Sequence, residues 1–582
     1  MAHFLESPTM PIRAAGKLGG PSSTAPLPII GVPVTAHSAD SHTPGVDGYP
    51  DKIDGAVLKV AGVVVLGAIM AILDITVVNV ALPDLQVTFT GADDPLPYST
   101  VAWTVTAYTL ALATVIPLTG WAADRFGTKR LYMLAIAFFT LGSVLCALAS
   151  TIGQLITFRA IQGLGGGMLM PLGMTIMTRA AGPKRMGRLM AILGVPMLLG
   201  PILGPILGGW LIEHYSWHWI FLINLPLGIA ALAYAAWALP KDAPQPSESF
   251  DVIGMLLMSP GLAMLLYGVS SIPEEGTFFA AKPIVFGSIG LVLLIAFVIY
   301  SFRPEHPLLD FRLFKNRNLT VSTITMFIFA AAFFGGLLLV PTYFQQVRLE
   351  SPLHAGLLVA PQGIGAMLTM PIAGALADKL PVGRIVPVGL LLIIGGMFAL
   401  TRVDGDTSYW GYLIPVLFVM GLGMGATMMP VMTAAIRTLT SHQVARGSTL
   451  LNITQQIASS IGVAIMSVVL TNGLRDDELI GQAQAFGEEA KNADPTALGA
   501  LLQKFPRVAE VLQGAGPDPV AAQEALGDAV RNAMGEVFGN TFLVAAILAT
   551  LTLIPALFLP RKHEESHLMD DVDPSAPPVV LH

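Results

Sequence analysis

Long apolar stretches recur along the chain, and charged residues or clusters of proline and glycine close each one. A bilayer core about 30 Å thick needs roughly 20 apolar residues in one helix, and the stretches are of that length. The pattern predicts an all-α membrane protein that crosses the bilayer many times. Fourteen spans are expected, at 57–83, 102–121, 131–149, 154–178, 189–212, 218–239, 252–270, 283–302, 319–344, 354–377, 385–401, 410–433, 447–471 and 541–559.

The composition leads to the same class and excludes others. Hydrophobic residues make up 54% of the 582 positions and charged residues 12%, which excludes an ordinary soluble protein. The net charge of -7 provides no overall basic field, so we expect no nucleic-acid partner. Because Cys146 is the one cysteine, an intramolecular disulfide, a thiolate metal cluster and a redox pair are excluded.

Lysines and arginines are sorted between the two sets of loops. With the N-terminus placed inside, 18 of them fall in inner loops or at the C-terminal end, and three, Lys282, Arg348 and Arg402, fall in short outer loops. Since inner loops carry the excess of positive charge, both termini are predicted to face the cytoplasm. The expected location is therefore the cell membrane (inner or plasma membrane), as a multi-pass protein.

Three segments are predicted to lie outside the membrane. Residues 1–56 are rich in Pro, Ser, Gly and Thr and are expected to form a disordered cytoplasmic tail, and residues 561–582 a second cytoplasmic tail. Residues 472–540 are expected to form an extracytoplasmic insert with short amphipathic helices. A cap or docking element for an extracytoplasmic partner and a solvated acidic loop are both open for this insert.

Two motifs occur twice in the same order. The segment that begins at Gly120 has an echo at Gly374, and the segment that begins at Gly163 has one at Gly421, at offsets of 254 and 258 residues. Because an offset of eight spans preserves orientation, the repeats predict two parallel six-helix bundles. The expected domains are a first bundle at 57–239, two additional helices at 240–303, and a second bundle at 304–471 with 541–560.

Two opposite charges lie inside predicted spans at one depth. Asp74 is nine residues from the outer end of the first span, about 14 Å, and Arg159 is eight from the outer end of the fourth, about 12 Å. A lone charge at mid-span costs on the order of 2.5–3.5 kcal/mol, which favours an ion pair or a shared hydrated cavity. Burial disfavours an ionised carboxylate and a nearby guanidinium favours it, so relative movement is expected to switch proton occupancy. Asp74 is the predicted proton carrier and Arg159 its modulator, with a structural ion pair as the alternative.

Glycines and prolines recur in the fifth span at four-residue spacing, most densely at Gly204, Pro205, Gly208 and Gly209. Small residues let two helices approach closely, and prolines bend a helix. A conformational hinge with a leak barrier and a simple packing seam are both open for this segment.

The loop between the second and third spans carries charge on the predicted cytoplasmic side. Its candidate gating residues are Gly120, Asp124, Arg125, Gly127 and Lys129. Such a loop can act as a charge latch against a neighbouring helix end or as a topology determinant.

The cargo is expected in a cavity between the two bundles. Its candidate lining residues are Thr76, Asn79, Trp103, Tyr108, Gln162 and Gln362. Helix packing is an equal alternative for the last four, because polar and aromatic side chains also pack between spans.

Taken together, these motifs resemble the major facilitator superfamily, specifically its fourteen-span drug:proton antiporters, over residues 57 to 560. The matching motifs of the first, fourth and fifth spans and of the charged loop are Asp74 to Pro83, Arg159 to Gly163, Gly204 to Gly209 and Gly120 to Arg130. The chain departs from the family at Thr128 and His218, where arginine is frequent. The echo at Asp378 also carries Pro381, so a latch of the same kind in the second half stays open.

The resemblance implies export of hydrophobic or cationic compounds, driven by proton entry, through alternating inward-open and outward-open states. It places Asp74 and Arg159 in the coupling path and makes the loop centred on Asp124 a cytoplasmic gate latch. The proton is the expected coupling ion, without a cofactor or metal. The expected partners are lipophilic small molecules, protons and the lipid bilayer.

Two alternatives remain for the function. The same exporter can carry an endogenous lipid, siderophore or metabolite instead of drugs. A membrane-embedded enzyme would need paired acids, a His/Cys metal set or a nucleophile with its base within the spans, whereas Asp74 and Arg159 supply one acid and one guanidinium. A transporter is therefore expected, and not an enzyme.

Overall fold

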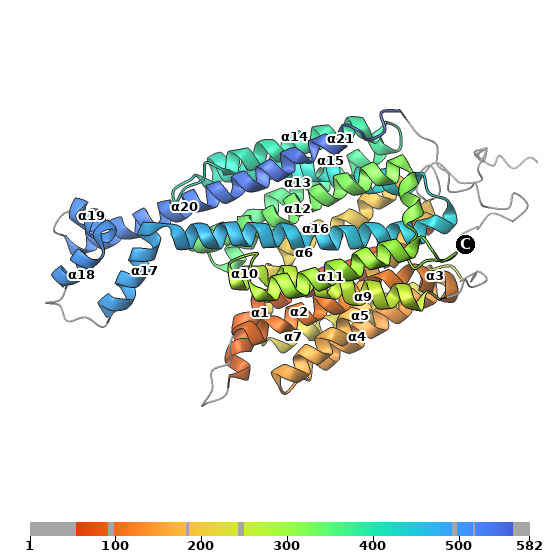
Figure 1. Cartoon of the computed structure of the whole chain (residues 1–582), viewed down its shortest axis with the longest axis horizontal. Coiled ribbons are helices and arrows are strands. Elements are labelled where there is room, and N and C mark those ends of the chain that lie inside the picture. The colour runs from red at the N-terminus through yellow and green to blue at the C-terminus, as the bar shows by residue number, and fades with distance from the viewer. Residues whose placement is uncertain are drawn as a thin grey trace, which may run out of the picture. The chain divides into compact units, whose positions relative to one another are not determined.

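The chain divides into two units, Met1–Pro44 and Gly45–His582, and all residues described below belong to the second. The computed structural model describes residues 54–90, 98–181, 185–241, 250–491, 498–515 and 518–562 (Figure 1). Every long regular element in these ranges is a helix, as expected for an all-α protein. Apart from residues 54–56 and 561–562, the predicted tails lie outside the described residues.

Thirteen helices in the described part of the chain are long and apolar enough to cross a membrane. Each covers one predicted span. The remaining predicted span falls within α6 (Met186–His214), a continuous helix of 29 residues. Its residues 189–212 include no charged side chain. Helix α6 is therefore long enough to be the fourteenth span.

Eight α-helices and one 3₁₀ turn form the six spans of the first bundle. In addition to α6, they are α1 (Gly55–Phe89), α2 (Tyr98–Val115), η1 (Ile116–Leu118), α3 (Thr119–Phe126), α4 (Thr128–Ala147), α5 (Ile152–Ala181), α7 (His218–Leu222) and α8 (Asn224–Ala238). Helix α5 packs against α2 and α4, and α1 packs against α5, α6 and α8. The middle of α1 therefore lies among three other helices, and a buried polar site can form there.

Glycines permit these close contacts. A Cβ on Gly142 of α4 would lie 2.6 Å from the Cα of Gln162 on α5, and a Cβ on Gly163 would lie 2.5 Å from the carbonyl oxygen of Tyr108 on α2. Real Cβ atoms do not approach other atoms so closely, so side chains here would force the helices apart.

The second bundle repeats this organisation further along the chain. Its elements are η2 (Phe311–Lys315), α12 (Arg317–Gln346), α13 (Pro352–Ala377), α14 (Val382–Leu400), η3 (Tyr409–Leu413), α15 (Ile414–Arg437), α16 (Ser441–Asp476), α20 (Pro519–Leu551) and α21 (Leu553–Ala556). Helix α15 packs between α13 and α14, and α12 packs against α16 and α20.

A helical hairpin connects the bundles. It consists of α9 (Val252–Ser270), the short α10 (Ile272–Glu275) and α11 (Ala281–Ser301). Tyr267 of α9 stacks on Trp103 of α2 at 5.4 Å between ring centroids, while Ile272 packs with Ala464 and Val468 of α16. The hairpin therefore contacts both bundles.

The predicted insert is helical and continuous with the helices on both sides of it. Helix α16 runs on to Asp476, and α20 begins at Pro519, so the predicted boundaries at 472 and 541 fall inside helices (Figure 1). Residues 520–540 are rich in Ala and contain no proline, so nothing stops the helix before the membrane segment. Three shorter helices lie between α16 and α20 in the sequence: α17 (Glu478–Lys491), α18 (Leu498–Lys504) and α19 (Pro506–Gly514). They share a small core around Leu501, Phe505 and Val508.

Candidate functional site

An ion pair lies in the interior of the first bundle. Arg159 Nη1 on α5 is 2.5 Å from Asp74 Oδ2 on α1, and both side chains are fully buried. Removing two charges from water costs several kcal/mol for each ion, unless short hydrogen bonds offset the loss. Other groups around the pair supply further hydrogen bonds that offset this cost in part.

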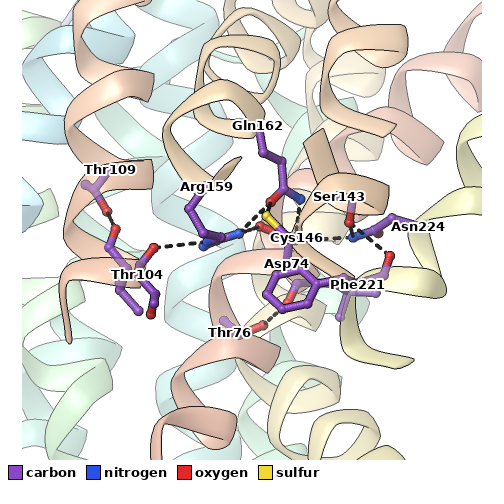
Figure 2. A network of polar contacts seen from close by, with 12 residues as sticks. Asp74, Thr76, Thr104, Thr109, Ser143, Cys146, Arg159, Gln162, Phe221 and Asn224 are labelled. Atoms are coloured by element: carbon purple, nitrogen blue, oxygen red, sulfur yellow. Dashed lines mark hydrogen bonds and ion pairs between the residues drawn. The ribbon is translucent and has the colours of Figure 1, made fainter. Parts of the chain in front are cut away.

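Two amides complete the hydrogen bonding of the Asp74 carboxylate (Figure 2). Gln162 Nε2 donates to Asp74 Oδ1 at 2.7 Å, and Asn224 Nδ2, from α8, lies 3.2 Å from the same oxygen. The amide oxygen of Gln162 accepts from Arg159 Nη1 at 2.9 Å and from Cys146 Sγ at 3.6 Å. Asp74 thus receives hydrogen bonds from two helices other than its own, α5 and α8.

The Arg159 guanidinium is held from a further side by α2. Its Nε donates to the Thr104 carbonyl oxygen at 3.0 Å, and its Cζ lies 4.2 Å from the centroid of the Tyr108 ring. A guanidinium over an aromatic face gains a cation–π attraction of about 2 kcal/mol or more when it is desolvated. In the described part of the chain, Arg159 Nη2 and the Tyr108 hydroxyl are buried without a hydrogen-bond partner. When the site rearranges, Arg159 Nη2 can donate a new hydrogen bond, and the Tyr108 hydroxyl can donate or accept one.

Helix α6 packs closely on α1 beside this site. The Thr76 hydroxyl, two residues from Asp74, lies 3.1 Å from the carbonyl oxygen of Gly200. A Cβ on Gly204 would lie 2.1 Å from Thr76 Oγ1, and one on Gly208 would lie 3.1 Å from Val77, whereas one on Gly209 would meet nothing within 4 Å. The glycine pattern is thus a seam between α1 and α6; the side chain of Pro205 lies outside the described residues.

The charged segment after the second span differs from the expected loop. Helix α3 continues to Phe126 and α4 begins at Thr128, so Gly127 alone separates them, with a φ of 90° that favours glycine. Asp124 Oδ1 lies 3.2 Å from Arg179 Nη2 of α5, in the same bundle. Lys129 Nζ donates to the carbonyl oxygens at the C-terminal end of α8, and Arg125 is exposed.

Contacts between the two halves lie at the predicted inner ends of the helices. Gly120 faces α16, since a Cβ there would lie 3.5 Å from Thr449 Oγ1, and Thr119 Oγ1 lies 3.2 Å from the same atom. The echo residue Asp378, next to α13, accepts from the Gly187 amide of α6 at 2.8 Å and from Arg188 Nε at 3.0 Å. Both repeats of the motif therefore lie at contacts between the halves, Gly120 against α16 and Asp378 against α6.

The candidate cavity residues fall into different places. Tyr108 and Gln162 belong to the polar site around Asp74, and Thr76 lies at the seam with α6. Trp103 stacks on the hairpin, and Asn79 is exposed. Gln362 is buried in the second bundle, where its Nε2 lies 3.2 Å from Met424 Sδ.

Four contributors to the site were missed from the sequence. Asn224, Ser143, Cys146 and the Thr104 carbonyl all contact the network around Asp74. Asn224 and Ser143 could have been found as polar side chains within apolar spans. Burial of an uncharged polar side chain costs far less free energy than burial of a charge, so such residues stand out less in the sequence. Among the described residues, no group of three or more His, Cys, Asp or Glu side chains is placed to hold a metal ion.

Two helical bundles, with a buried acid–guanidinium pair inside the first, are the architecture expected of a membrane transporter. The family model of the Major Facilitator Superfamily matches residues 64–463, and the chain belongs to this superfamily. The resemblance seen in the sequence motifs is thereby confirmed.

Several relatives are similar over most of the chain. The "Multidrug resistance protein B homolog" of Mycobacterium tuberculosis is 47% identical over 538 residues, which cover 92% of this chain and 96% of the relative. The "Putative multidrug resistance protein MdtD" of Pectobacterium carotovorum is 33% identical over 417 residues, 70% of this chain and 86% of the relative. The "Multidrug export protein EmrB" of Haemophilus influenzae is 29% identical over 427 residues, 73% and 82% of the two chains.

Solved structures share the fold at low identity. The human organic anion transporter MFSD10 superposes with a TM-score of 0.52 and 17% identity, covering 85% of this chain and 99% of that one. The proton:xylose symporter XylE superposes with a TM-score of 0.51 and 15% identity, covering 88% and 98%. At this identity the likeness concerns the arrangement of helices alone.

Proposed function

We propose that the protein is a proton-driven antiporter that exports lipophilic or cationic compounds. The observation that carries the proposal is the fully buried contact of 2.5 Å between Asp74 and Arg159. A titratable carboxylate at this depth is costly to maintain and is a functional candidate by default. The names of the relatives, which speak of multidrug resistance and multidrug export, indicate the class of cargo.

Asp74 is the proton carrier in this mechanism, and Arg159 sets when it is ionised. A proton from outside neutralises the carboxylate and weakens its attraction to the guanidinium. Arg159 stays charged throughout, because a guanidinium does not deprotonate under these conditions. When the carrier opens inward, the proton leaves and the ion pair re-forms. The proton is the coupling ion, and no cofactor takes part.

Helix α6 is suited to connect this site with the junction between the halves. Its middle lies against Thr76, two residues from Asp74, through Gly200 and Gly204. Its N-terminal turn is bound to Asp378 of the second half. A change in α1 that follows protonation of Asp74 can therefore displace a helix that also holds the inner junction.

The proposal includes the setting of the protein. It lies in the cell membrane with both termini in the cytoplasm, acts as a transporter without enzymatic activity, and has no nucleic-acid partner. An extracytoplasmic partner for residues 472–540 stays a prediction.

Transport into proteoliposomes under an imposed pH gradient tests this function. The native protein and the Asp74→Asn variant are compared with several lipophilic cations, such as tetraphenylphosphonium. We expect gradient-driven transport by the native protein and none above the leak by the variant. Equal transport by both would refute Asp74 as the carrier. No transport of any drug-like cation, together with a lipid, siderophore or metabolite that co-purifies with the protein, would favour an endogenous cargo.

A further inference from the structure

The carboxylate of Asp74 faces hydrogen-bond donors. Arg159 Nη1, Gln162 Nε2 and Asn224 Nδ2 lie 2.5, 2.7 and 3.2 Å from its oxygens. An ionised carboxylate only accepts, so it suits these neighbours, whereas a protonated carboxyl has an O–H that needs an acceptor. The arrangement is therefore that of the ionised site, and proton uptake requires at least one neighbour to turn or withdraw.

A chain of hydrogen bonds fixes which end of the Asn224 amide faces Asp74 (Figure 2). Ser143 Oγ lies 2.9 Å from the carbonyl oxygen of Phe221, and because a carbonyl can only accept, the single hydroxyl hydrogen of Ser143 is used there. Toward Asn224, at 3.0 Å, Ser143 can then only accept. Asn224 must present its NH₂ group, which has one hydrogen for Ser143 and one for Asp74.

The two side chains that link Phe221 to Asp74 by hydrogen bonds are buried and come from different helices. Ser143 lies on α4 and Asn224 is the first residue of α8, with exposures of 0% and 2%. An amide buried at this depth does not turn without losing both hydrogen bonds. The Phe221 carbonyl and Ser143 therefore make the donor orientation of Asn224 the stable one.

We propose that Ser143 and Asn224 are positioning residues that hold Asp74 in its ionised state, bound to Arg159, and that release of the Asn224 amide is a step of proton uptake. This inference rests on the proposed role of Asp74 as the proton carrier. Without the pair, the protonated carboxyl is less disfavoured, so Asp74 takes up its proton at higher pH. The loss of one hydrogen bond to a charged group changes an equilibrium by about tenfold or more, which corresponds to a shift of about one pH unit.

The other titratable side chains around Asp74 are Arg159 on α5, Tyr108 on α2 and Cys146 on α4. Neither Ser143→Ala nor Asn224→Leu changes any of these three side chains. A comparison of such variants with the native protein therefore isolates the amide from the charges around it.

Infrared difference spectroscopy of the purified full-length protein in lipid measures this directly. The C=O stretch of a protonated carboxyl is followed as a function of pH and is assigned to Asp74 by its loss in Asp74→Asn. The test variants are Asn224→Leu, which removes the donor, and Ser143→Ala, which leaves Asn224 but frees its orientation. We expect the midpoint of the Asp74 signal to move upward by about one pH unit in both.

Thr140→Ala is the matched control. Thr140 is also a buried hydroxyl on α4 that faces α8, since a Cβ on Gly228 would clash with it, but its hydrogen bond goes to Ile136 within its own helix. We expect the native midpoint in this variant.

The outcomes separate the two proposals. A midpoint that stays unchanged in both test variants, or that moves equally in Thr140→Ala, overturns the positioning role while Asp74 remains the carrier. If Asp74 gives no titrating signal between pH 4 and 10, a range of roughly three units around neutral pH, both proposals fail. Ser143→Ala removes one oxygen atom only, so it keeps the test decisive if Asn224→Leu does not fold.

Discussion

The backbone amide of Gly187 donates to the carboxylate of Asp378 at 2.8 Å, and this contact joins α6 of the first half to the end of α13 in the second. The backbones themselves touch here, since a Cβ on Gly187 would lie 2.4 Å from the carbonyl oxygen of Gly374. Arg188 Nε adds an ion pair at 3.0 Å. The first turn of α6 is thus bound by an acid whose negative charge also complements the positive end of the helix dipole.

We expect Asp378→Asn to loosen this junction. The substitution keeps the shape but removes the charge that binds Arg188 and the amide of Gly187, an effect of about 1.5 kcal/mol or more. Hydrogen exchange of the amides in the first two turns of α6 should become roughly tenfold faster. Asp406→Asn, which changes an exposed acid in the loop after α14, is the control. Unchanged exchange in α6 of the Asp378 variant would show that this ion contact does not hold the junction.

Arg159→Leu is expected to destabilise the protein by about 3–5 kcal/mol, because it leaves the buried charge of Asp74 unpaired. The double variant Asp74→Asn with Arg159→Leu should recover most of that loss without recovering transport. Thermal unfolding in detergent and proteoliposome transport measure the two effects.

The pair of Arg179 and Asp124 provides the comparison for that experiment. Its two side chains are 38% and 31% exposed, so the same substitution, Arg179→Leu, should cost less than about 1 kcal/mol. Equal losses for the buried and the exposed arginine would contradict the assigned burial of the Asp74 site.

Gly204→Ala should impair both folding and transport. The new Cβ would lie 2.1 Å from Thr76 Oγ1, so α1 and α6 must separate, at a cost of about 1–3 kcal/mol. Gly209→Ala is the matched control on the same helix, since a Cβ there meets nothing within 4 Å. We therefore expect a lower melting temperature than that of the native protein for Gly204→Ala, and the native melting temperature for Gly209→Ala. A similar drop in both variants would exclude close packing at Gly204 as the cause.

The loop at Asp404, between α14 and η3, should lose stability in acid. A hydrogen bond from the Thr407 hydroxyl, followed by the backbone amides of Asp406 and Thr407, lowers the pKa of Asp404 below its usual value, against the opposing effect of burial. Because the folded pKa is lowered, this stabilisation is present above the unfolded pKa, near 3.9, and is lost as the pH falls through the folded value.

Thr407→Val tests the cause of that shift. Carbon-13 NMR of protein labelled at the aspartate carboxyl carbons, with Asp404→Asn for assignment, should show the pKa of Asp404 closer to its ordinary value in the valine variant. An identical titration in both proteins would assign the shift to the backbone amides instead.

The helices and the central pair were predictable because they depend on large, local free energies. Twenty apolar residues in sequence have few alternatives to a span, and two charges such as Asp74 and Arg159 at one depth are costly enough to seek each other. Asn224 carries no charge, and its importance comes from the position of Ser143 on another helix. That relationship appears only when α4, α8 and α1 are packed together.

The inner junction was less predictable for a related reason. The motif at Asp124 and its echo at Asp378 both end in charge beside a helix end, and the sequence does not state which helix lies opposite. Packing places Arg179 of the same bundle next to Asp124 and Gly187 of the other bundle next to Asp378. The boundary at residue 540 marks where the apolar segment begins, whereas the helix that contains this segment starts earlier, at Pro519.

Since α16 and α20 pass without a break from the second bundle into the insert, the small domain of α17, α18 and α19 is attached to one half of the transporter by continuous helices. Asn532 of α20 also binds the loop after α14, where its Oδ1 accepts from the Gly405 amide at 3.1 Å. A fluorophore or a bound antibody fragment on α17 would consequently move with the second half during each cycle. Rocking of the two halves within the bilayer would then be followed at a domain that belongs to neither bundle.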